Sequence, residues 1–402
     1  MMKNSTFLLI ASLLCSYPAF ALAPDNNGIY RISTGSELEE FAAIVNNGQT
    51  DADAVLVSDI DMTGITHTAI GTTQNPYRGK WDGRFHTIDN LEMDNADGVN
   101  LALFGVAAVG AKFSNTILGS GCYFSGKDKV AGFVSQCRDA VEGTIEFSCL
   151  GNEGAIHAYQ KDGSEARAAA IAGPSNGNVA YKFANCYNTG EVRGLAVGAL
   201  SCYAPSAQVI GCFSVTDVKK QANPDAKASN PSPVSQVLIK GVEQPLSPWT
   251  FCCFFGGAEG KGTYAENGYD KAVTWKPPYD LRDNSWTIYK VFEEEWAPTG
   301  MMCWYLNNQS SDNPVWGQNL DEGDQYPSFM PGKLIVFNEN GSYVNKTSSI
   351  PAPEDLPEIS AVEDIKESAK TTKTIYTLQG IKIEHISTPG FYIIDGKKVI
   401  IR

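Results

Sequence analysis

K-F-A-N-C (182–186) is one version of a short unit that recurs along the chain. The other versions are T-I-D-N-L (87–91), K-F-S-N-T (112–116), I-E-F-S-C (145–149) and Q-V-I-G-C (208–212). A second unit, which ends in a small residue, alternates with the first: A-L-F-G (102–105), G-F-V-S (132–135), A-I-A-G (170–173) and G-A-L-S (198–201). A supersecondary unit that repeats cannot bury its apolar face alone, so it stacks on its neighbours.

The spacing of these units fits one coil of a parallel β-helix. The Asn, Ser or Gly positions of the first unit follow one another at 25, 33, 37 and 26 residues. Each interval holds short apolar runs separated by Gly, Asn or Asp, whereas helical repeats of this length would show a 3.6-residue period. We therefore predict a parallel β-helix over about 86–215, with Asn185 and its equivalents at turns.

A capping helix is predicted in front of the coils. Ser36 is a good N-cap, and Glu39 three residues later completes a capping box. The apolar residues of one helical face follow: Leu38, Phe41, Ala42 and Val45. Such a helix would cover the open end of the stack, where a bare edge invites aggregation.

The C-terminal half has a weaker pattern. We expect further irregular coils up to residue 345, with a helix near 293–306 that Pro298 and Gly300 break. Residues 346–374 read as a polar linker. The tail at 375–402 alternates apolar and polar residues in two hairpin-like pairs, one of them around Asp395-Gly396.

Residues 1–21 are typical of a secretory signal peptide. Lys3 supplies the positive end, residues 7–14 the apolar stretch, and A-F-A (19–21) a small-x-small cleavage site. A lipoprotein signal at Cys15 is disfavoured, because the preceding leucine is too large for that cleavage. We therefore expect a chain that is exported, secreted or held at the cell surface.

The charge and hydropathy of the chain argue against some classes of binding partner. Loss of residues 1–21 removes one Lys and no acid, which changes the formal net charge from −14 to −15. No cluster of Lys or Arg is present, which argues against nucleic acid and anionic membrane surfaces. No later stretch approaches the roughly 18 apolar residues of a transmembrane helix.

Nine of the ten cysteines remain after cleavage, and an odd number disfavours a disulfide scaffold. Cys149, Cys186 and Cys212 occupy the same place in successive units. Stacked side chains run parallel, whereas a disulfide needs converging Cβ atoms. An internal ladder of free thiols is favoured over a disulfide-stapled stack.

Several stretches resemble GLUG-repeat proteins. Y-R-G-K-W-D-G-R-F-H-T-I-D-N-L (77–91), followed by L-F-G (103–105), is similar to their first repeat, and F-A-N-C-Y-N-T-G-E-V (183–192) matches the repeat itself. Trp81 stands where the family usually has Phe, and Phe85 where it usually has Gly. These two departures put the packing of the first coil in doubt.

The C-terminal part extends this resemblance. Residues 300–329 look like the segment that often follows such repeats in surface proteins of Bacteroidetes. The tail at 375–402 looks like a C-terminal sorting domain of that phylum, with Arg402 in place of the usual final Lys. The resemblance implies a right-handed β-helix exported to the cell surface and a role for the tail in engaging a secretion machinery. It implies no activity, because such repeats occur both in adhesins and beside enzymes.

The predicted fold is thus all-β: a right-handed parallel β-helix with an N-terminal capping helix and a small C-terminal β domain. The expected segments are a signal peptide at 1–21, an N-terminal cap and lead-in strands at 22–85, a GLUG-like β-helix at 86–345, a linker at 346–374 and a sorting-like β unit at 375–402.

No catalytic constellation is evident. His67, His86, His157 and His385 lack partners at metal-ligand spacing. Asp51, Asp53, Asp59 and Asp61 lie outside any known calcium-loop pattern. The charged turns at 128–129 and 138–139 have no equivalent one coil later, as a β-helix lyase or hydrolase would need. We predict no enzyme, no cofactor and no metal.

Tryptophans are the one hint of binding. Five fall in the C-terminal half and are candidates for stacking on a ligand: Trp249, Trp286, Trp296, Trp304 and Trp316. Exposed Trp rings stack well on sugar rings, but a hydrophobic cap or second core at the end of the β-helix is the favoured explanation of these tryptophans.

The predicted function is a non-enzymatic, exported surface β-helix used for adhesion or for binding an extended polymer, such as an extracellular glycan or a host surface polymer. Two alternatives stay open: a polysaccharide-acting enzyme of the β-helix class and a passive structural spacer.

Overall fold

The computed structural model describes most of the first 214 residues and selected later segments. The described ranges are 22–159, 166–194, 196–202, 207–214, 218–220, 232–234, 249–250, 253–254, 297–307, 311, 314–330, 332–346, 375–377, 382–383, 390–394 and 397–401. The chain divides into two compact units, residues 1–354 and 355–402, and each is described by itself.

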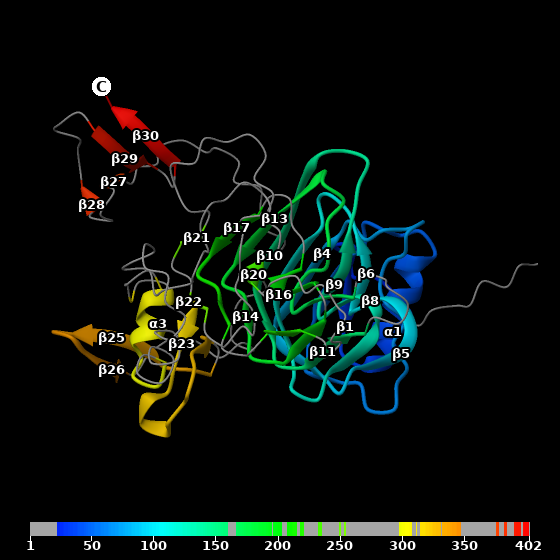
Figure 1. The fold of residues 1–402 in the computed structure, drawn as a ribbon, viewed down its shortest axis with the longest axis horizontal. Helices are drawn as coiled ribbons and strands as arrows, with labels where there is room; N and C mark the ends of the chain where they lie inside the picture. Colours follow the sequence, from blue (N-terminus) through cyan, green and yellow to red (C-terminus); the bar gives the residue numbers. More distant parts are fainter. Residues whose placement is uncertain are drawn as a thin grey trace, which may run out of the picture. The chain divides into compact units, whose positions relative to one another are not determined.

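A parallel β-solenoid makes up most of the first unit, as the repeats predict; Figure 1 shows β10, β13 and β17 side by side. The first face is a sheet in the order β1 (Ile29–Ile32), β2 (Asp53–Leu56), β4 (Lys80–Asp89), β7 (Lys112–Leu118), β10 (Gly143–Asn152), β13 (Val179–Ala184), β17 (Ala207–Ile210) and β21 (Trp249–Thr250). Short parallel strands extend it: β3 (Ile60–Asp61), β14 (Tyr187–Asn188), β18 (Phe213–Ser214) and β22 (Cys253–Phe254). Parallel stacking therefore begins at β1, ahead of the first repeat.

Two further faces close each coil. The second face has the order β19 (Val218–Lys220), β15 (Val192–Gly194), β11 (Ala155–Ala158), β8 (Tyr123–Ala131), β12 (Arg167–Ala169), β16 (Ala196–Ser201) and β20 (Ser232–Val234), with β5 (Glu92–Leu101) beside β8. The third face pairs β6 (Phe104–Ala107) with β9 (Val134–Cys137), and single bridges continue it along the stack.

An aromatic ladder fills the interior of the first face. Trp81, Phe113, Phe147 and Phe183 are paired in register on successive strands, and all are buried. The Phe113 and Phe147 rings stack with centroids 5.4 Å apart, and the Phe147 and Phe183 rings with centroids 5.1 Å apart. The indole N–H of Trp81 donates to the Thr116 hydroxyl at 2.9 Å. The larger Trp81 is therefore accommodated in the first full coil.

A column of left-handed residues marks the turn after this ladder. Asn115, Cys149, Asn185 and Gly211 have φ between 51° and 62°. The repeat therefore aligns Cys149, and not Ser148, with the asparagines, because the turn requires a positive φ. This corrects the predicted register by one residue.

The same shift corrects the cysteine ladder. Cys186 and Cys212 are equivalent and touch, the Cys186 N–H lying 3.2 Å from the Cys212 sulfur, whereas Cys149 belongs to the turn column. No disulfide involves Cys122, Cys137, Cys149, Cys186, Cys202, Cys212 or Cys303. The repeat T-I-D-N-L (87–91) is also displaced in register. Ile88 points inward as expected but pairs with Leu118, while Phe113 pairs with Trp81.

The capping helix α1 (Gly35–Asn46) is present but begins earlier than predicted. Its N-cap is Thr34, whose side chain accepts the N–H of Glu37. Glu37, three residues after this N-cap, takes the place predicted for Glu39, and its carboxylate accepts the N–H of Ser33 at 2.7 Å. The buried face is the predicted one: Leu38, Phe41, Ala42 and Val45.

Residues 297–346 differ from the irregular coils expected there. They form α3 (Met301–Leu306), β23 (Trp316–Gly317), the 3₁₀ turn η2 (Leu320–Glu322), β24 (Ser328–Phe329), β25 (Ile335–Glu339) and β26 (Ser342–Lys346). The strands pair antiparallel, β23 with β24 and β25 with β26. We call residues 297–346 the cover.

The second unit contains a small antiparallel sheet in the order β28 (Lys382–Ile383), β27 (Ile375–Thr377), β29 (Gly390–Ile394) and β30 (Lys397–Ile401). Ile394 pairs with Lys397 across the predicted Asp-Gly turn. Among the described helices, none is long and apolar enough to cross a membrane.

Candidate functional site

The second face of the solenoid carries a group of aromatic and charged side chains on its outer surface. β8, β11 and β15 stack in parallel, and their inward residues Phe124, Ile156 and Val192 are buried. Because successive side chains of a strand point to opposite faces, the alternate residues point outward. His157 lies opposite Arg193 in this register. We name the outer-face cluster by its members, which are Tyr123, His157, Tyr159, Glu191 and Arg193.

A continuous chain of hydrogen bonds links the polar atoms of the outer-face cluster. The Tyr159 hydroxyl lies 3.0 Å from His157 Nδ1, and His157 Nε2 lies 2.9 Å from a Glu191 carboxylate oxygen. Arg193 holds both oxygens of Glu191 with its Nε and Nη2 atoms at 2.6 and 2.7 Å. Since Glu191 accepts, neutral His157 carries its proton on Nε2 and accepts from Tyr159 at Nδ1.

Two tyrosine rings flank the imidazole. The Tyr123 ring meets the His157 ring edge-on, with centroids 5.4 Å apart. The centroid of the Tyr159 ring lies 5.8 Å from that of the His157 ring. Tyr159 is 38% exposed, and the side chain of Arg193 is 44% exposed. The outer-face cluster thus offers solvent an aromatic surface beside a planar, hydrogen-bonding ion pair.

Electrostatics shift the pKa values of Glu191 and Tyr159 away from neutral pH. Burial alone would raise the pKa of Glu191, but the hydrogen bonds from Arg193 and His157 outweigh it and lower that pKa. Burial, followed by the neighbouring Tyr123, raises the pKa of Tyr159. Glu191 is therefore ionised and Tyr159 protonated, whereas a general acid or base works best with a pKa near the operating pH.

The cluster also lacks a nucleophile pair. Ser125 lies opposite His157 on the adjacent strand. Both ring nitrogens of His157 are already bonded, to Glu191 and to Tyr159, so the imidazole has no nitrogen left for the serine hydroxyl. A serine nucleophile needs such a base within hydrogen-bond reach. Ser125 and His157 therefore do not form a nucleophile–base pair.

The tryptophan candidates occupy different settings. Trp304 is half-buried and packs on the core, and Trp316 is fully buried. Trp249 belongs to strand β21, but its side chain is outside the described part of the chain. Trp286 and Trp296 lie outside the described residues. A fully buried ring has no face to offer a ligand, so Trp316 is a packing residue and not a stacking platform.

Trp316 packs on an apolar row outside the solenoid. Its ring stacks on Phe329 with centroids 4.9 Å apart and lies 5.1 Å from the ring of Phe213. Phe329 also contacts Tyr187 at 5.3 Å and Phe85 at 5.5 Å. The cover therefore shields this row from water. Phe85 has φ 64° where the resembling family has Gly, and the contact with Phe329 helps to hold it there.

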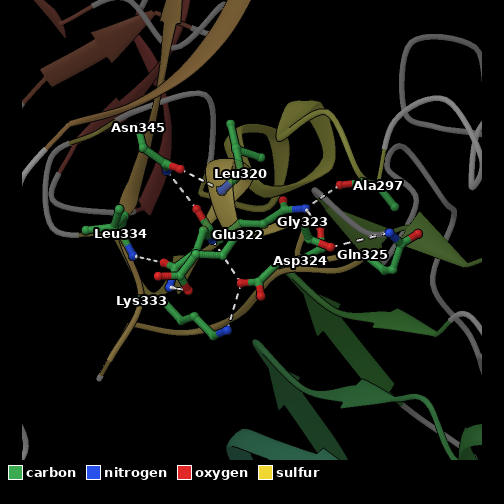
Figure 2. Close-up of polar contacts among 11 residues, drawn as sticks. Ala297, Leu320, Glu322, Gly323, Asp324, Gln325, Lys333, Leu334 and Asn345 are labelled. Atoms are coloured by element: carbon green, nitrogen blue, oxygen red, sulfur yellow. Dashed lines mark hydrogen bonds and ion pairs between the residues drawn. The ribbon is translucent and has the colours of Figure 1, made fainter.

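Polar side chains hold the cover together (Figure 2). The amide of Asn345 donates to the Gln318 carbonyl at 2.7 Å and accepts the Leu320 N–H at 2.6 Å. The Lys333 ammonium bonds to the Asp324 carboxylate at 2.7 Å, and Gln318 donates to the Asp324 carbonyl at 2.9 Å. These bonds fix the chain around η2, so we regard this network as scaffold.

Three of the four acidic candidates for calcium already accept hydrogen bonds within the fold. Asp53 accepts the Lys80 N–H at 2.7 Å, and Asp59 accepts the Thr87 N–H at 2.9 Å. Asp61 accepts from Thr63 and Asn90, which lowers its pKa to about 2. In the part of the chain that the structure describes, no group of three or more His, Cys, Asp or Glu is placed to hold a metal.

The charged turns at 128–129 and 138–139 contribute ion pairs between coils. Arg167 makes a bidentate pair with Asp128, its Nε atom 2.9 Å from one carboxylate oxygen and its Nη2 atom 2.5 Å from the other. Asp139 accepts from Arg78 at 2.6 Å and from the Val109 N–H at 3.1 Å. The Asp128–Arg167 pair joins consecutive coils, and the Asp139–Arg78 pair spans two coil spacings, so both hold the stack.

Sequence reasoning missed the outer-face cluster. Its members come from three strands, and a single histidine gives no metal or triad pattern. A usable sign was present: His157 lies in a strand and Tyr159 follows two residues later, just past its end, and Tyr123 and Glu191 each lie 34 residues from His157, close to one coil length. Residues with such spacing share one outer face of neighbouring coils.

Comparisons with known proteins leave the family open. No family model and no curated protein matches the chain. A solved structure described as "a putative immunoglobulin A1 protease from Bacteroides ovatus" is 11% identical, with a TM-score of 0.38; the alignment covers 77% of this chain and 95% of that one. A likeness this distant carries no argument, so the GLUG resemblance rests on the quoted residues alone.

Proposed function

We propose that this chain is an exported, non-enzymatic β-solenoid that binds an extended polymer, a glycan in particular, through the outer-face cluster. The observation that carries the proposal is the exposed Tyr159 beside the Glu191–Arg193 pair on the outside of stacked coils. Tyrosine rings stack on the apolar face of a sugar, and planar charged groups bond to its hydroxyls. A stack of coils gives a linear polymer successive, evenly spaced contacts.

The pKa shifts in the outer-face cluster support binding over catalysis. The pKa of Glu191 is lowered and that of Tyr159 is raised, so both keep one protonation state around neutral pH. Fixed donors and acceptors suit selective hydrogen bonding to a ligand. The export role and the sorting role of residues 375–402 belong to the same proposal and rest on the sequence patterns of the two ends.

A glycan array with the secreted protein tests this function. The Tyr159→Ala variant should lower affinity for the bound glycan about tenfold, the effect of losing about 1.4 kcal/mol at an aromatic contact. The matched control is Lys182→Ala, because Lys182 is similarly exposed, at 51% of its side chain, on the other outer face. Equal affinities of the two variants would exclude the outer-face cluster as the binding site.

The same assay judges the two alternatives. If the bound polysaccharide is shortened, with new ends that Glu191→Gln abolishes, the protein is an enzyme and the binding role is secondary. If no glycan or mucin binds to the folded protein at all, the passive spacer is the better account.

A further inference from the structure

The backbone nitrogen of Leu22 is held by the capping helix. It lies 2.6 Å from a carboxylate oxygen of Glu40, in a half-buried setting. The Leu22 side chain packs against the hydrophobic core of the first unit. Leu22 is the first residue after the predicted cleavage site A-F-A (19–21).

Glu40 differs from the other glutamates of α1. Glu37 bonds to Ser33 at the N-terminus of the helix, and Glu39 bonds to His67 and to the Thr68 N–H. Within the described residues, the only hydrogen bond of Glu40 is the one from Leu22, and it makes no ion pair. A carboxylate is thus committed to a nitrogen that is a neutral amide in the uncleaved chain.

We propose that Glu40 is the docking site for the new amino terminus created by removal of residues 1–21. This inference rests on the export part of the proposed function. Hydrolysis breaks the C–N bond between Ala21 and Leu22; water supplies the oxygen of the new Ala21 carboxylate, and the Leu22 nitrogen becomes an α-ammonium. The hydrogen bond from a neutral N–H to the Glu40 carboxylate is then replaced by an ion pair between the α-ammonium and that carboxylate.

The charges around the pair favour this state. The carboxylates of Glu37 and Glu39 stand on the same helix, and Asp25 on the approach to β1 is paired with Arg31 at 3.9 Å. The Glu40 carboxylate, 2.6 Å from the Leu22 nitrogen, stabilises an ammonium there. A free α-amino group has a pKa of about 7.7–8.0. Pairing raises it, so the stabilisation is complete below that range and is lost as the pH rises through the raised pKa.

The test compares four secreted proteins that start at Leu22: the native chain and Glu40→Gln, each with a free or an acetylated amino terminus. Mass spectrometry first checks that the mature chain begins at Leu22. Acylation of the α-amine at pH 7 should be about tenfold slower in the native chain than in Glu40→Gln, corresponding to a pKa raised by one unit.

Acetylation should also lower the melting temperature of the native chain by about 1–2 °C and leave that of Glu40→Gln unchanged. A mature chain that begins elsewhere overturns the proposal, and so do equal acylation rates in the two proteins. Glycan binding is measured separately on the same samples, so loss of that function and failure of this docking are distinguishable.

Discussion

Replacement of Phe183 by Ala tests the interior ladder most directly. Phe183 is 1% exposed; its ring stacks on Phe147 with centroids 5.1 Å apart and meets Tyr181 edge-on at 5.6 Å. Truncation removes the buried ring and leaves a cavity, which costs about 3–5 kcal/mol for a core Phe→Ala change. The two aromatic contacts, worth about 0.5–1.5 kcal/mol each, place the expected value in the upper half of that range.

Urea unfolding of the mature chain, followed by far-ultraviolet circular dichroism, measures the loss. Because coils stack on their neighbours only, the slope with urea is compared between variants to check that the same structure unfolds. The matched control is Val141→Ala, since Val141 is 58% exposed and should change stability by less than about 0.5 kcal/mol. A loss under about 1 kcal/mol for Phe183→Ala would refute the stacked interior.

Four further outcomes are expected. Asp128→Asn should destabilise the fold by about 2 kcal/mol, because it takes the charge from the bidentate partner of Arg167; an unchanged urea midpoint contradicts this. Burial raises the pKa of Cys137 to about 12, so a thiol reagent at pH 8 should label it only after unfolding, and rapid labelling of the native protein would count against the burial of this thiol. The lowered pKa of Glu191 means that its ion pair stabilises the fold above about pH 4.3 and is lost as the pH falls further; Glu191→Gln should reduce that acid sensitivity in thermal melts, and identical profiles would argue against the pair. Deletion of 375–402 should leave the protein folded but absent from the cell surface, and normal shaving of the truncated protein by protease on intact cells would show that the tail is not a sorting element.

The repeats identified the solenoid because stacking imposes the same demand on every coil. Phe113, Phe147 and Phe183 recur since each must cover the ring before it. The register was harder to predict at Cys149. A small polar residue such as Ser148 resembles Asn in a sequence, but the turn selects by backbone φ, and the residue that adopts φ 52° is the cysteine.

The candidate site was beyond the sequence for a different reason. Composition identified Trp316 as an aromatic residue without showing that the cover buries it completely. The outer-face cluster depends on which residues of separate coils face each other, and coil lengths vary through loops of irregular size. An error of one residue would move His157 to the interior, so its partners became evident only from the strand pairing.

The late position of the cover in the chain has a consequence in time. Phe213 belongs to the apolar outer row, and Trp316, which shields it, follows 103 residues later. At a synthesis rate of about 5–20 residues per second, Trp316 is made roughly 5–20 s after Phe213. A coil that folded at once on the ribosome would expose its aggregation-prone aromatic rings to water throughout that interval. Slow folding before the proposed export would keep these rings from being exposed on a folded coil. A chaperone that keeps the chain unfolded until residue 346 has emerged would have the same effect.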